Sequence, residues 1–124
     1  MKKLIYTAHS GETMKYSEFI WEYVYKKGHL PIDPFLVAPY KLWTDLVNGN
    51  KYQAAKDGIE MMFRCDELWI FGETGKDALK KSGVRAEYEA WKKERGESSI
   101  KFVTWEEVGI PKYQDGGWDN IPKS

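Results

Sequence analysis

Residues 65–87 constrain the fold of this chain more than any other stretch of the sequence. An apolar, aromatic run at 67–71 has the length and composition of a buried β-strand and ends at Gly72-Glu73. A polar, glycine-containing loop follows, and helical spacing begins near Ser82-Gly83. In open α/β sheets, ligands bind beyond the carboxyl ends of the strands, where loops lead into helices. The stretch therefore predicts a ligand crevice, with Glu87 on the first turns of the adjacent helix.

Short apolar runs alternate with segments of helical spacing along the whole chain. The runs that predict strands are 3–8, 29–35, 67–71 and 100–105, and the segments that predict helices are 13–27, 37–47, 52–64 and 82–94. Pro31 and Pro34 each remove a backbone donor from the second run, which favours an edge strand ending at Asp33-Pro34. Such alternation is typical of a parallel sheet with helices on both faces. We therefore predict an α/β fold, a single Rossmann-like or flavodoxin-like domain with about four strands in the order 2-1-3-4.

The predicted domain covers residues 1–110, and residues 111–124 form a tail without periodicity, for which we predict irregular structure. Lysine plus arginine and aspartate plus glutamate number 19 each, so the formal charge is zero and the basic surface of a nucleic-acid-binding protein is not expected. No apolar run approaches the length of a membrane span. Cys65 is the only cysteine, which favours a reducing compartment. We expect a cytoplasmic protein that binds neither nucleic acid nor membrane.

The predicted strand order brings two loops to one crevice. His9-Ser10-Gly11 follows the first strand, and Gly72-Glu73 begins the loop after the third. Asp33 ends the second strand, so its side chain is also a candidate to face a ligand. For Asp33 and Glu73 the alternative is an ordinary turn or capping role. His9, in the first of these loops, is a candidate to contact a ligand or to assist proton transfer, and the alternative is a loop histidine with no chemical role.

Glu87 and Tyr6 each have a chemical and a structural interpretation. A glutamate beside the inward face of a helix can attack the anomeric carbon of a sugar or accept a proton. The alternative is a solvated carboxylate paired with a nearby lysine or arginine. The Tyr6 hydroxyl, in the first strand, can orient a carboxylate, whereas the alternative is a plain core tyrosine. Spacing alone favours the structural interpretation of both residues.

Two short segments are candidates for anion binding. Ser10-Gly11 and Ser82-Gly83 each precede a predicted helix, where free backbone N–H groups can hold a phosphate. Ordinary N-capping is the alternative for Ser82. The chain has neither a phosphate-loop motif nor a Gly-x-Gly-x-x-Gly sequence after the first strand. Its two histidines and one cysteine are distant in sequence and form no zinc pattern, so we expect neither a cofactor nor a metal.

Four segments together resemble the nucleoside 2-deoxyribosyltransferase-like superfamily, and in particular its small bacterial and phage members. They are Lys3-Leu-Ile-Tyr-Thr-Ala8, Lys27-Gly-His-Leu-Pro-Ile-Asp-Pro34, Arg64-Cys-Asp-Glu-Leu-Trp-Ile-Phe-Gly72 and Ser82-Gly-Val-Arg-Ala-Glu-Tyr-Glu89. The resemblance extends over nearly all of the chain up to about residue 105. It implies a small-molecule nucleoside or nucleotide as the ligand. It also implies a homodimer or larger homo-oligomer, which agrees with the high content of tryptophan and tyrosine.

The resemblance implies specific roles for several residues. In that superfamily a glutamate attacks C1′ of a deoxynucleoside, the base leaves, and the sugar passes to a second base or to water. Glu87 matches the position of this nucleophile, and Tyr6 matches a first-strand tyrosine that orients it. The loop His9-Ser10-Gly11 would line the sugar or base pocket, and Ser82-Gly83 would bind a 5′-phosphate.

Two departures from the superfamily pattern leave an alternative open. Transferases usually carry an aspartate shortly before the glutamate, to assist the leaving base, and the corresponding residue here is Lys81. The small residue that usually precedes the glutamate is replaced by Arg85-Ala86, which adds positive charge. The first hypothesis is therefore an enzyme that cleaves or transfers at the N-glycosidic bond. The alternative is a non-catalytic nucleotide-binding module with the same pocket.

Overall fold

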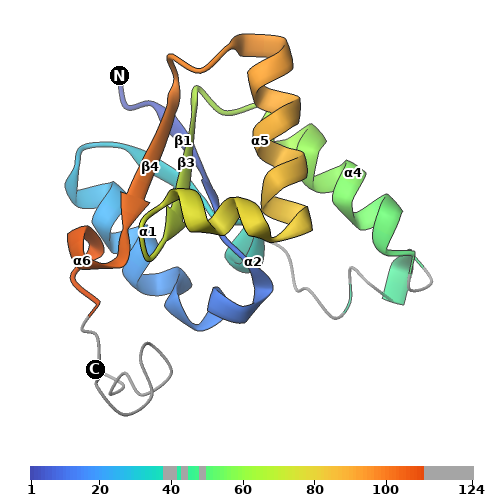
Figure 1. Cartoon of the computed structure of the whole chain (residues 1–124), viewed down its shortest axis with the longest axis horizontal. Helices are drawn as coiled ribbons and strands as arrows, with labels where there is room; N and C mark the ends of the chain where they lie inside the picture. Colours follow the sequence, from blue (N-terminus) through green and yellow to red (C-terminus); the bar gives the residue numbers. More distant parts are fainter. Residues whose placement is uncertain (38–41, 43–44, 48–49, 111–124) are drawn as a thin grey trace.

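The fold is a parallel β-sheet with helices packed on both faces (Figure 1). The structure is a computed structural model and describes residues 1–37, 42, 45–47 and 50–110. Within these residues the strands are β1 (Leu4–Ala8), β2 (Leu30–Ile32), β3 (Glu67–Gly72) and β4 (Ile100–Thr104). They form one four-stranded sheet in the order β2-β1-β3-β4, and every neighbouring pair is parallel. This arrangement confirms the predicted fold class and strand order.

The helices differ from the predicted segments mainly at their ends. The described helices are η1 (Gly11–Tyr16), α1 (Ser17–Lys26), α2 (Pro34–Val37), α4 (Lys51–Met62), η2 (Lys76–Lys80), α5 (Ser82–Arg95) and α6 (Trp105–Val108), of which η1 and η2 are 3₁₀-helices. The predicted helix at 13–27 is thus two elements. Thr13 closes the first turn of η1 because both its N–H and its hydroxyl donate to the Ser10 carbonyl. Most of the predicted helix at 37–47, and the tail at 111–124, lie outside the described residues.

The second strand is shorter than the predicted run at 29–35 because α2 begins at Pro34. Proline is well suited to the first position of a helix, where its missing N–H has no intrahelical partner. Asp33 precedes it, and its Oδ1 accepts the N–H of Phe35 at 2.9 Å, as a helix-capping carboxylate does. The chain therefore turns from β2 into α2 at Asp33, which fixes this carboxylate at the carboxyl end of the sheet.

Alternating side chains of the strands form two separate cores, one on each face of the sheet. On one face, Ile5, Trp69 and Phe71 pack against α1 and against Trp105 at the start of α6. On the opposite face, Tyr6, Ala8, Leu68 and Ile70 pack against Met62 of α4 and against Val84 and Trp91 of α5. Because strand residues point alternately to the two faces, Tyr6 is directed toward α5, whereas Thr7 points the other way. No helix in the described part of the chain is long and apolar enough to cross a membrane.

Candidate active site

Tyr6, in the middle of β1, and Glu87, in the second turn of α5, form a direct side-chain pair. The Tyr6 hydroxyl donates to Oε2 of Glu87, with 2.6 Å between the two oxygens. Tyr6 is 1% exposed, and Glu87 is half-buried. The strand side chain and the helix side chain meet because Val84 and Trp91 anchor α5 on the same core as Tyr6. The pair joins residues 81 positions apart in sequence.

Burial controls the protonation of this pair. It is the largest influence on the Glu87 carboxyl group and raises its pKa to about 7. The hydrogen bond from Tyr6 acts in the opposite direction, while the nearby negative charge of Asp33 raises the pKa further. Burial and the Glu87 carboxylate also raise the pKa of the Tyr6 phenol, so the phenol remains a donor at neutral pH. Near pH 7 the Glu87 carboxyl group is therefore present in both its protonated and its ionised form, and it can donate or accept a proton.

The raised pKa of Glu87 predicts that this residue makes folding pH-dependent. Because the protonated carboxyl favours the folded state, its stabilisation is complete below the unfolded value of 4.5 and is lost as the pH rises through about 7. We expect wild-type protein to lose on the order of 1–2 kcal/mol more unfolding free energy than Glu87→Gln between about pH 5 and pH 8. Urea titrations at both pH values measure the difference. Parallel curves for the two proteins would contradict a buried, titrating Glu87.

His9 and Asp33 form a second polar cluster, entirely enclosed by protein. Nε2 of His9 is 2.7 Å from Oδ2 of Asp33, and both side chains are 0% exposed. Asp33 also accepts from the hydroxyls of Thr7, at 2.9 Å, and Ser17, at 3.3 Å. Together with the Phe35 N–H, these donors surround the carboxylate. The cluster ties β1, β2, α1 and α2 to one another at the carboxyl edge of the sheet.

The second nitrogen of His9 fixes the loop that follows β1. Nδ1 lies 2.8 Å from the Thr13 hydroxyl, which donates its own proton to the Ser10 carbonyl. Both ring nitrogens are thus engaged within the protein. This places His9 and Asp33 as residues that shape the loop, with Ser10 and Gly11 at its outer surface.

The loop after β3 is held by Asp77, which the sequence argument did not identify. Its carboxylate accepts from the backbone N–H groups of Glu73, at 3.2 Å, and Thr74, at 2.9 Å. A Cβ on Gly72 would lie 2.4 Å from Oδ1 of Asp77, so a side chain at this position would displace the carboxylate that holds the loop. The sequence does contain a pattern that predicts this loop structure. Thr74 and Asp77 are three residues apart, a spacing typical of two residues whose side chains cap each other's backbone N–H groups. Gly72 thus supports the loop, and Glu73 lies at its exposed surface.

The start of α5 differs from the capping alternative that the sequence suggested. Lys81 occupies the N-cap position with an extended backbone and makes no side-chain cap, and Ser82 is the first residue inside the helix. Ser82 and Gly83 are both exposed, and a Cβ on Gly83 would meet nothing within 4 Å. Nζ of Lys81 instead binds Oε1 of Glu12 in η1, at 2.8 Å. Ser82 and Gly83 are therefore accessible to a ligand, and their first-turn N–H groups receive no side-chain cap from Lys81.

The predicted site residues thus separate into three groups. Tyr6 and Glu87 are paired, and His9 and Asp33 are enclosed together. The remaining six lie at the ends of strands, in loops or at helix starts: Ser10, Gly11, Gly72, Glu73, Ser82 and Gly83. Two surface grooves in the described part of the chain contain none of them. One is lined by Asp57, Glu60, Met61 and Arg64, and the other lies between α1 and α6. The described residues also include no group of three His, Cys, Asp or Glu side chains that could hold a metal ion.

Comparisons with protein-family models, with curated proteins and with solved structures found no match to this chain.

Proposed function

We propose that this protein cleaves or transfers at the N-glycosidic bond of a nucleoside or nucleotide, with Glu87 as the nucleophile. The observation that carries the proposal is the 2.6 Å hydrogen bond between buried Tyr6 and half-buried Glu87, on the face of a parallel sheet that α5 covers. A carboxylate on the solvent-facing side of the helix would not contact a buried tyrosine of the sheet. The resemblance of the sequence to the nucleoside 2-deoxyribosyltransferase-like superfamily supports the same two residues in the same two roles.

The proposed reaction has two displacement steps at one carbon. An oxygen of Glu87 attacks C1′ of the sugar, and the C1′–N bond breaks as the C1′–O bond forms. The base departs with the bonding electron pair and takes up a proton from solvent. Water or a second base then attacks C1′, which releases the sugar and regenerates the Glu87 carboxylate. The pKa near 7 suits this cycle, because the group is substantially ionised at neutral pH while burial keeps its charge poorly solvated.

The experiment that tests this function measures free base and enzyme-bound sugar together. Wild-type protein is incubated with a panel of ribo- and deoxyribonucleosides and their 5′-monophosphates, and the base is quantified by chromatography. Acid-quenched samples are then measured by intact mass, since a glycosyl ester adds the mass of one sugar residue. We expect base release for at least one substrate and an adduct on the peptide that contains Glu87. Turnover of no substrate across the panel would reject the proposal.

Tyr6→Phe should weaken the proposed reaction without removing the nucleophile. Loss of a hydrogen bond to a charged carboxylate costs about 1.5–3 kcal/mol, so we expect kcat/KM to fall roughly 10- to 150-fold. Because the Tyr6 hydrogen bond lowers the pKa of Glu87, the acid limb of the pH–rate profile should also move to higher pH. Tyr88→Phe is the matched control, since the hydroxyl of Tyr88, the next residue along the same helix, donates an exposed hydrogen bond to Glu97 at 2.7 Å. An unshifted acid limb in Tyr6→Phe would argue against the orienting role.

A second candidate function, nucleotide binding without catalysis, is favoured by Lys81. Where transferases of the superfamily usually have an acid, this chain has a lysine paired to Glu12, and Arg85 is exposed on the next turn of α5. Thermal or chemical unfolding with and without nucleotide separates the two functions. A ligand at a hundred times its dissociation constant should stabilise the protein by about 2.7 kcal/mol. Binding that survives Glu87→Ala, in a protein that releases no base, supports the binding module.

A further inference from the structure

The two polar clusters of the candidate site are built on neighbouring residues of β1. Tyr6 points toward α5 and donates to Glu87. Thr7, the next residue, points to the opposite face of the sheet and donates to Asp33 at 2.9 Å. The strand register places Ile32 beside Tyr6, so Asp33 follows directly at the end of β2. The Asp33 carboxylate and the Glu87 carboxyl group therefore meet two adjacent residues of one strand from its two faces.

Asp33 and His9 have no polar side-chain atom left to offer a ligand. Both side chains are 0% exposed. Both oxygens of Asp33 accept hydrogen bonds from protein groups, and both ring nitrogens of His9 lie within 2.8 Å of protein oxygens. Any part that these two residues play in the chemistry of the site has to be exerted at a distance.

The charge of Asp33 can act at a distance because packed protein separates it from Glu87. Tyr6 is 1% exposed and Thr7 is 0% exposed, so these two residues of β1 are shielded from water. Charges that are buried in this way are screened much less than charges in solvent. Burial is the first cause of the raised pKa values of Glu87 and Tyr6, and the negative charge of Asp33 adds to both. Asp33 is thus electrostatically coupled to the pair on the other face of the sheet.

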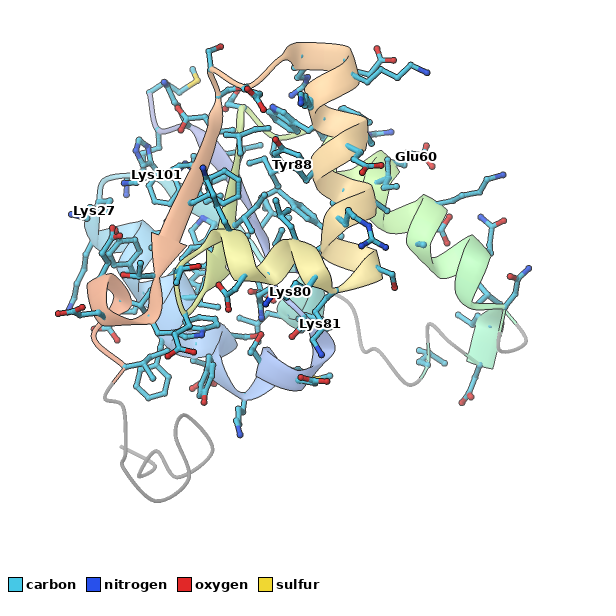
Figure 2. All side chains as sticks on the ribbon, in the orientation of Figure 1. Lys27, Glu60, Lys80, Lys81, Tyr88 and Lys101 are labelled. Carbon is cyan, nitrogen blue, oxygen red and sulfur yellow. The ribbon has the colours of Figure 1, made fainter. Side chains whose placement is uncertain are left out.

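Within the described part of the chain, Tyr6 from β1 and Asp33 from the end of β2 are the titratable groups that act on Glu87. The helices η2 and α4 also pack against α5, and their charged side chains are exposed or interact elsewhere: Lys76, Asp77, Lys80, Lys56, Asp57 and Glu60. Figure 2 shows two of these side chains, Lys80 on η2 and Glu60 on α4. The influence of Asp33 on Glu87 can therefore be removed by a single substitution.

We propose that Asp33 is a positioning residue of the site, whose enclosed carboxylate acts across the sheet on Glu87 and controls how much of Glu87 is ionised at neutral pH. With Asp33 charged, Glu87 is divided between its protonated and ionised forms near neutrality, where its ionised fraction responds most strongly to pH. Without that charge, more of Glu87 is ionised at the same pH. The inference rests on the proposed function only in giving the ionised Glu87 the role of nucleophile.

NMR titration of the glutamate side-chain carboxyl carbons tests this role without any need for catalysis. The signal of Glu87 is identified by its loss in Glu87→Gln and is followed with pH in wild type and in Asp33→Asn. Asparagine at this position removes the charge and nearly keeps the shape. We expect the pKa of Glu87 to fall by about 0.5–1 unit, which is roughly a three- to tenfold rise in the ratio of ionised to protonated Glu87.

Control variants separate loss of the charge from loosening of the fold, which would also lower the pKa of Glu87 by admitting water. Thr7→Val removes a hydrogen bond from the same cluster but keeps the Asp33 charge, so the pKa of Glu87 should not fall. Glu89→Gln removes an exposed carboxylate from α5 and should have no effect either. Asp33→Ser removes the charge with a different shape, retains an acceptor for the Phe35 N–H, and should lower the pKa as Asp33→Asn does. Thermal unfolding verifies each variant, and about 1 M sucrose is added to all samples if a variant at position 33 is not folded in buffer.

The outcomes distinguish failure of this role from failure of the proposed function. An unchanged or raised pKa of Glu87 in the folded variants at position 33 would overturn the role of Asp33, as would an equal fall in Thr7→Val or Glu89→Gln. A lowered pKa in a protein that releases no base would support the role of Asp33 and reject the proposed reaction. Base release by a protein whose Glu87 titration is unshifted in Asp33→Asn would reject the role of Asp33 alone. If base is released, the acid limb of the pH–rate profile should move to lower pH in Asp33→Asn by the same amount as the NMR titration.

Discussion

Glu87→Ala should abolish base release while leaving the fold intact. If Glu87 is the nucleophile, its removal eliminates the covalent route altogether, and losses of roughly four orders of magnitude or more are expected from such changes. The variant also relieves the cost of burying a carboxylate, so its unfolding free energy near pH 8 should not fall by much. The measurement is base release from the best substrate of the panel, with thermal unfolding of the same samples to verify the fold.

Two further variants make this result specific to the nucleophile. Glu87→Gln retains a side chain of the same shape that can still accept from Tyr6, and it should be as inactive as the alanine variant. Glu89→Ala removes an exposed carboxylate from the same helix and should retain full activity. Turnover by Glu87→Ala equal to that of wild type would reject the assignment. Equal losses in Glu87→Ala and Glu89→Ala would instead point to a general effect on α5.

Asp33→Ala should have the largest effect on stability among the residues of the site. It leaves His9, which is 0% exposed, without the partner that lies 2.7 Å from its Nε2. The hydroxyls of Thr7 and Ser17 and the N–H of Phe35 lose their acceptor at the same time. Each buried donor left without its acceptor typically costs about 1–3 kcal/mol. Because total stabilities are only about 5–15 kcal/mol, much of this protein should be unfolded or close to unfolding.

Chemical unfolding measures this effect, and a double-mutant cycle assigns it to the pair. If the His9–Asp33 contact is the main term, Asp33→Ala combined with His9→Ala should cost clearly less than the sum of the two single changes. Glu22→Ala is the control, since it removes an exposed carboxylate that binds Lys26, and it should change stability by less than about 1 kcal/mol. Additive costs for Asp33→Ala and His9→Ala would show that the two side chains are not coupled.

The strand order could be predicted from the sequence because it depends on local features. The apolar runs are long enough for single strands, and Pro31 and Pro34 exclude the second run from the centre of the sheet. The ends of the strands and helices were harder to predict from the sequence, because they depend on side-chain hydrogen bonds that form only in the folded chain. Asp33 terminates β2 through its capping bond to Phe35, and η1 forms because Thr13 folds back onto Ser10. Trp105, predicted to end the last strand, instead begins α6, where Thr104 and Glu107 form a capping box.

Only part of the candidate site could be predicted from the sequence. Spacing alone favoured a solvated Glu87 and a plain core tyrosine at position 6, and only the resemblance to a superfamily paired them. The enclosure of His9 with Asp33 had no sequence signal, because Thr7, Thr13 and Ser17 are ordinary residues until the fold surrounds them. The Glu12–Lys81 pair had none either. Two exposed charges 69 positions apart are not distinguishable from any other lysine and glutamate.

The sequence by itself determined the alternation of strands and helices, the edge position of β2 and the glycine-containing loops at one end of the sheet. These properties follow from periodicity and from the backbone restrictions of proline and glycine, which act over a few residues. The tertiary structure decided which side chains meet at that end and which of them lose water. Burial is the largest influence on the pKa of Glu87, so this carboxyl group acquires its raised pKa only when β1 and α5 have packed together. The Tyr6–Glu87 hydrogen bond and the Glu12–Lys81 ion pair likewise form only in the folded chain.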